Sequence, residues 1–155
     1  MIRQLPAVVR PVPADIGEAR SLADRLSGDP ADWLPDPARR RGPDRWSIAL
    51  AAGPFHRSVA CSVGTAWRTG EEELWRRVSW TPEAEPSDLV PLRAMLPSFD
   101  GQVGVRSDAD GCALVLRGTY EPPGGVIGAA ADATALHAVA AITAARFLDG
   151  IIRRL

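Results

Sequence analysis

The sequence predicts an α+β domain in which a curved antiparallel sheet of about seven strands is covered by one long C-terminal helix. Between residues 46 and 120, short segments that alternate between apolar and polar side chains, the period of strands, are separated by turns and loops. The residues after 128 are rich in alanine, and their larger apolar side chains recur at helical spacing. Between them lies YEPPGGVIG, residues 120–128, whose prolines cannot continue a strand ladder and whose glycines permit a sharp turn. We therefore expect the terminal helix to fold back across the sheet.

Composition sets the broad class of the protein. A chain of 155 residues suits one domain, and we expect residues 1–155 to form it. The 46% hydrophobic and 24% charged content is that of an ordinary globular protein. The formal net charge of -1 argues against a general nucleic-acid binder, which would carry a basic excess.

The N-terminal part predicts one strand followed by two short helices. Residues 5–12 suit an edge strand, where prolines are tolerated. Residues 14–28 predict a helix with Asp15 as its N-cap, and residues 29–37 predict a helical turn between two Asp-Pro pairs. The arginine-rich residues 38–45 are expected to form a polar loop.

The remaining strands follow one another closely, which favours an antiparallel meander. They are expected at residues 46–52, 56–67, 73–80, 90–96, 99–106 and 112–120. One face of residues 56–67 is expected to carry Val59, Cys61, Val63, Thr65 and Trp67.

The last helix is expected from about Gly125 to Arg154. Asp132 near its start and Arg153 at its end complement the helix dipole. A helix laid across a concave sheet touches it at the ends and leaves space in the middle, so a cavity is expected there. Its roof is predicted to be the helix stripe Leu136, Val139, Ala140, Thr143 and Phe147. Its walls are predicted to include Trp67, Trp80 and Phe99.

The order of these elements is similar to the helix-grip fold of the START-related (SRPBCC) superfamily, which includes birch-allergen-like proteins, lipid-transfer domains and polyketide cyclases. Four segments resemble those of small actinobacterial members: VSWTPE, PSFDGQVGV, LVLRGTYEPPGGVIG and LHAVAAITAARFLDGI. The resemblance covers residues 46–155 and departs at Ala138, where those members have arginine. It implies a START/SRPBCC-like domain with a ligand cavity, and it carries no established catalytic residues.

We favour binding of a small hydrophobic or aromatic ligand over catalysis, because the sequence shows no catalytic constellation. The alternatives are a polyketide cyclase/aromatase-like enzyme and a structural or interaction protein whose cavity is filled by its own side chains. For the enzyme, the polar candidates are Arg93, Tyr120 and His137, although a structural role is favoured for His137 because no carboxylate partner lies at one-turn spacing. Arg76 and Arg93 would anchor an anionic group if they face inward, whereas most strand arginines face solvent.

No cofactor and no metal site are expected. The chain has no CxxC, HxxxH or HExxH spacing and no GxSxG elbow, and the GGVIG run lacks the βαβ unit of a dinucleotide site. Cys61 and Cys112 are expected to be buried free thiols rather than a disulfide.

The expected location is the cytoplasm. The N-terminal residues MIRQLPAVVRPVP lack the apolar core of a signal peptide. The uncharged run at residues 133–145 is short for a bilayer, so no membrane span is expected. The expected partner is a small apolar or aromatic molecule, and the oligomeric state has no signal in the sequence.

Overall fold

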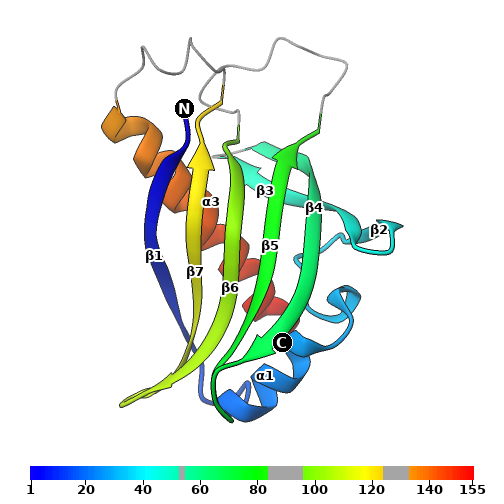
Figure 1. Cartoon of the computed structure of the whole chain (residues 1–155), viewed down its shortest axis with the longest axis vertical. Coiled ribbons are helices and arrows are strands. Elements are labelled where there is room, and N and C mark those ends of the chain that lie inside the picture. Colours follow the sequence, from blue (N-terminus) through cyan, green and yellow to red (C-terminus); the bar gives the residue numbers. More distant parts are fainter. Residues whose placement is uncertain (53–54, 84–95, 124–132) are drawn as a thin grey trace.

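The computed structural model describes residues 1–52, 55–83, 96–123 and 133–155 (Figure 1). The elements are β1 (Arg3–Val12), α1 (Ala19–Ser27), the 3-10 turn η1 (Pro30–Asp32), β2 (Arg39–Gly42), β3 (Arg45–Ala52), β4 (Phe55–Arg68), β5 (Leu74–Pro82), β6 (Ser98–Asp108), β7 (Gly111–Glu121) and α3 (Ala133–Arg154). The described strands form one seven-stranded sheet in the order β1-β7-β6-β5-β4-β3-β2, with all neighbours antiparallel. The predicted α+β class, with a curved antiparallel sheet and a long C-terminal helix, is confirmed.

One of the seven strands is not the one that the sequence predicted. The prediction of a polar loop at residues 38–45 is wrong. Strand β2 forms there and pairs with β3, with Arg40 opposite Trp46. The Arg40 guanidinium lies over the Trp46 ring, 4.5 Å from its centroid, and also bonds Asp29. Such a strand is held by cross-strand contacts rather than by an apolar face. The strand predicted at 90–96 lies almost wholly outside the described residues, and β5 pairs directly with β6.

The N-terminal helices are shorter than predicted. Helix α1 begins at Ala19 after Glu18, so the expected capping role of Asp15 is wrong. The backbone turns first, with Ile16 N donating to Pro13 O at 3.0 Å, and this turn separates Asp15 from the helix. The second predicted helix is only the turn η1, whose Ala31 N donates to the Asp29 carboxylate at 3.0 Å. The part of the last helix predicted at 125–132 lies outside the described residues.

A β-bulge in β4 decides which side of the sheet its last residues face. Val63 pairs with Val78, but the next described pair is Ala66 with Arg76, so β4 carries one residue more than β5. The alternation reverses at the bulge. Trp67, predicted on the inner face with Val63, therefore lies on the outer face and is 39% exposed. The prediction that Trp67 lines an interior cavity is wrong for this reason.

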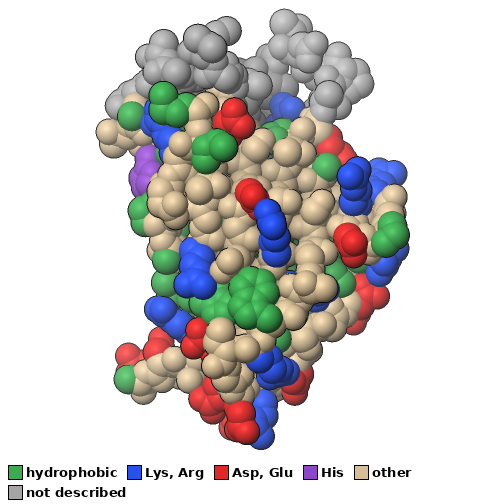
Figure 2. All heavy atoms as spheres, viewed as in Figure 1, with side chains coloured by type: hydrophobic (Ala, Val, Ile, Leu, Met, Phe, Trp, Pro, Cys, Tyr) green, Lys and Arg blue, Asp and Glu red, His purple; other side chains and the backbone are tan. Residues whose placement is uncertain are grey.

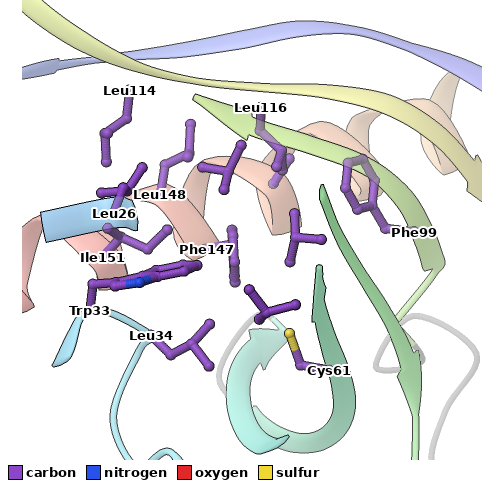
Figure 3. Packing of buried hydrophobic residues seen from close by; sticks show 14 of the residues in the cluster. Leu26, Trp33, Leu34, Cys61, Phe99, Leu114, Leu116, Phe147, Leu148 and Ile151 are labelled. Atoms are coloured by element: carbon purple, nitrogen blue, oxygen red, sulfur yellow. The ribbon is translucent and has the colours of Figure 1, made fainter. Parts of the chain in front are cut away.

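Helix α3 lies behind the sheet in the view of Figure 1, crosses its concave face and contacts β1, β3 and β7. Its C-terminal end is attached firmly to the α1 region: Arg154 donates to Ala31 O at 2.8 Å and Arg25 donates to Arg154 O at 3.2 Å. In Figure 3, Phe147 lies between Trp33 and Leu26 on one side and Phe99 on the other. The core beneath the C-terminal half of α3 is filled by large side chains.

By length and composition, α3 is the single helix among the described residues that could cross a membrane. In the structure it is a partly buried element of a small sheet domain, as the core helix of many folds is. The buried side chains of α3 pack on the concave face of the sheet, so the apolar residues of this helix form part of the protein core.

Candidate functional site

The two halves of α3 are buried to different degrees, and this difference locates the candidate site. All buried residues of the helix lie from Ala140 onward. Leu136, His137 and Val139 continue the same stripe but are only half-buried. The site is therefore the end of the sheet–helix interface beneath the N-terminal half of α3.

Three strand residues and two residues of α3 form an aromatic cluster between sheet and helix, which we define as Trp80, Phe99, Tyr120, His137 and Phe147. Cross-strand pairing sets the row, because Trp80 pairs with Phe99 and Phe99 pairs with Tyr120. The rings of Trp80 and Phe99 stack with centroids 4.4 Å apart, and the Phe147 ring lies 5.0 Å from that of Trp80. Trp80 Nε1 donates to Pro97 O at 3.1 Å, which fixes the indole orientation.

The polar end of the aromatic cluster is a contact between Tyr120 and His137. The Tyr120 hydroxyl lies 3.4 Å from His137 Nδ1, and the ring centroids are 6.0 Å apart. Tyr120 is 2% exposed, whereas His137 is half-buried. The hydroxyl donates when Nδ1 is unprotonated, so the pair offers a fixed polar group beside apolar rings.

A close approach of backbones allows Phe99 to lie against the sheet. Gly101 pairs with Gly118, and a Cβ on Gly101 would lie 2.2 Å from Arg117 O and 2.6 Å from Phe99 Cζ. Any side chain at 101 would displace the Phe99 ring or separate the strands. The two glycines thus help to position the aromatic cluster.

The predicted site residues are distributed as follows. Trp80, Phe99, Ala140, Thr143 and Phe147 are buried between sheet and helix. Leu136 and Val139 lie at the half-buried end of the stripe. Tyr120 and His137, named separately as polar candidates, are brought into contact. Arg93 lies outside the described residues.

Arg76 faces inward but serves the fold. Its guanidinium donates to Gly64 O and Leu26 O at 2.8 Å, and to Gly28 O at 2.6 Å. It also lies over the Trp33 ring, 5.6 Å from the centroid. Burial lowers the pKa of Arg76, and nearby carboxylates oppose that shift. With Nε and Nη1 bonded to these carbonyls, Arg76 joins β5 to β4 and to the end of α1.

Arg57 is the inward-facing cation that the sequence reasoning missed. It lies on β4 two positions before Val59, it pairs with the core residue Leu50, and it is 9% exposed. The alternation that placed Val59 and Cys61 on the inner face would have placed Arg57 there as well. Because most arginines in strands face solvent, Arg57 was not predicted to face the interior.

A separate groove of about 580 Å³ lies on the other side of α3 and includes Leu50, Ile142, Arg146 and Asp149. Ile142 is 54% exposed there, and Asp149 is paired with Arg10. This groove is open and lined by charged side chains, unlike the aromatic cluster. On the convex face of the sheet, seen in Figure 2, charges of both signs are scattered, as in the Arg77–Asp100 pair.

Both cysteines are free and buried, as predicted. Burial raises the pKa of Cys61 to about 12, and burial together with Asp108 raises that of Cys112. A raised pKa leaves less thiolate at pH 8, so we expect native protein to react slowly with Ellman's reagent, Cys61 slowest of all. Guanidinium chloride should release both thiols at once. Two fast equivalents in native protein would contradict this placement.

Among the described residues, no group of three His, Cys, Asp or Glu side chains converges on a point that could hold a metal ion. Comparisons with protein-family models, curated proteins and solved structures find no match to the chain. Its function must therefore be inferred from the site itself.

Proposed function

We propose that this chain binds a small apolar or aromatic molecule between the sheet and the N-terminal half of α3. The observation that carries the proposal is the aromatic cluster at the end of the interface where the helix stripe becomes half-buried. Leu136 and Val139 extend a continuous apolar stripe, and a ligand lying against them would complete the core that α3 begins at Ala140. Each Å² of apolar surface so covered would stabilise the complex by about 25 cal/mol before ordering costs.

The Tyr120–His137 pair supports the same proposal. Ligand sites are mostly apolar with a few polar groups that fix orientation, and this pair is such a group beside the rings of Phe99 and Trp80. A helix-grip protein of the START-related (SRPBCC) type, acting in the cytoplasm, is the setting we propose for this function. The proposal rests on the resemblance in sequence and on the layout of sheet and helix.

Catalysis of the cyclase/aromatase type is the second candidate. It is favoured by one observation, the contact between Tyr120 and His137, because a phenol and an imidazole in contact can move a proton at neutral pH. The two functions differ in what a Tyr120→Phe variant loses. A binder keeps its affinity, whereas a cyclase loses turnover of a poly-β-ketone thioester while still binding it.

The third candidate is a protein whose interior is filled by its own side chains. It is favoured by the position of Trp80 between Phe99 and Phe147. This candidate and the binding proposal give opposite results in a single titration, described next.

Titration with N-phenyl-1-naphthylamine, a neutral probe that fluoresces in apolar sites, tests the proposal. We expect saturable binding of one probe per chain. Leu136→Trp should weaken binding about tenfold or more, because the larger ring occupies the half-buried end of the stripe. Ile142→Trp is the matched control: it places the same ring in the groove on the other side of α3 and should leave binding unchanged. Ala140 is unsuitable for this test because it is 2% exposed and lies in the packed core.

Absence of saturable binding would overturn the proposal and favour a closed interior. Loss of binding in Ile142→Trp but not in Leu136→Trp would move the site to the charged groove. Melting curves of both variants without probe provide the folding control.

A further inference from the structure

Arg57 is an inward-facing arginine, 9% exposed, whose side chain has no partner in the described protein. Its Nε is buried with no hydrogen bond to any described group, and no described carboxylate lies within ion-pair distance of its guanidinium. Only Nε is fully buried, and the two terminal nitrogens still reach the surface, so the guanidinium is open to a ligand and makes no contact that stabilises the fold. Arg76, on the same face of the same sheet, shows the contrast, because it donates to three backbone carbonyls.

The nearest acidic group on neighbouring strands is committed elsewhere. Glu83 accepts from Ser58 Oγ at 2.5 Å and from Ser47 Oγ at 3.2 Å. Ser58 adjoins Arg57 in β4, so its side chain projects from the opposite face of the sheet. Glu83 is thus held on the outer face and cannot neutralise Arg57.

Arg57 faces the same interior as the aromatic cluster. Along β4 it is in phase with Val59 and Cys61, both of which belong to the core, and Cys61 pairs with Trp80. The Cα atoms of Arg57 and Cys61 are about 13 Å apart along the strand. A long arginine side chain can bridge part of that distance, and the proposed ligand must span the rest.

We propose that Arg57 binds the carboxylate of an acidic ligand whose apolar body lies against the aromatic cluster. This inference rests on the proposed binding function and adds the chemical class of the ligand: a monocarboxylic acid with an aliphatic or aromatic body. A guanidinium matches a carboxylate with two parallel hydrogen bonds, and that match is strongest where water is excluded. The ligand thus neutralises a charge that the described protein leaves unpaired.

Two acid–neutral pairs test the proposal: dodecanoate with dodecan-1-ol, and 2-naphthoate with 2-naphthylmethanol. Calorimetric titration of the wild type should show each bound acid held at least about tenfold more tightly than its neutral partner. In Arg57→Met the preference should disappear while the neutral partner binds as before. Arg106→Met, which removes an exposed cation from the outer face, should keep the full preference. The better-bound pair identifies the aliphatic or aromatic body.

The outcomes separate this inference from the binding function beneath it. Equal binding of acid and alcohol by the wild type, or an unchanged preference in Arg57→Met, overturns the carboxylate assignment alone. Failure of every acid and every alcohol to bind overturns the binding function and, with it, the assignment. An independent readout is the melting temperature of ligand-free Arg57→Met, which should stay within about 2 °C of the wild type because the substitution removes no contact with the described protein. A fall of more than about 4 °C would show that the fold itself needs the guanidinium and would overturn the proposal.

Discussion

Replacement of Arg76 by methionine should lower the free energy of unfolding by about 3 kcal/mol. The guanidinium joins three chain segments, donating to Gly64 O beside the β4 bulge and to Leu26 O and Gly28 O at the end of α1. Methionine preserves the apolar stem but leaves these carbonyls without their charged donor. Urea denaturation followed by tryptophan fluorescence measures the difference.

Arg77→Met is the matched control on the adjacent position of β5. Arg77 points outward and bonds exposed Asp100 at 3.2 Å, so its loss should change the free energy of unfolding by about 0.5 kcal/mol. Equal effects of the two substitutions would mean that Arg76 does not hold α1 to the sheet.

Gly101→Ala should destabilise the protein by a similar amount, about 3 kcal/mol. The added Cβ would meet Arg117 O at 2.2 Å and Phe99 Cζ at 2.6 Å, and a backbone oxygen cannot move without disturbing the β6–β7 pairing. The Phe99 ring must also shift, so stacking on Trp80 should be weakened. Denaturation gives the stability, and the near-ultraviolet circular dichroism of the indole gives the shift in stacking.

Gly70→Ala is the control for Gly101→Ala, because a Cβ at position 70 would meet nothing within 4 Å. The free energy of unfolding should change by less than about 0.5 kcal/mol. If Gly101→Ala were equally mild, β6 and β7 would not approach each other as closely as described.

The sheet could be predicted from the sequence wherever one face of a strand is apolar. Val59, Cys61 and Val63 alternate cleanly, and their strand is confirmed. The bulge after Val63 has no such signal, so the orientation of Trp67 was predicted wrongly. Strand β2 has no apolar face at all and depends on contacts such as Arg40 with Trp46, which only the folded chain brings together.

The candidate site could be predicted only in part. Helical spacing identified the α3 stripe, but the contact of Tyr120 with His137 depends on strand register and on where the helix crosses the sheet. The spacing of residues along the chain gives neither the strand register nor the point where the helix crosses the sheet. The alternation of β4 could have predicted that Arg57 faces inward with Val59 and Cys61. It was excluded only because strand arginines were expected to face solvent. Its burial without a partner is a property of the tertiary structure.

The most direct test is to locate a bound ligand by nuclear Overhauser effects between unlabelled dodecanoate and 13C-labelled protein. Binding between sheet and helix predicts contacts from the ligand chain to the methyl groups of Leu136 and Val139 and to the ring of Tyr120. Contacts to Ile142 and Ala145 instead, on the other side of α3, would place the ligand in the charged groove and contradict the proposed site.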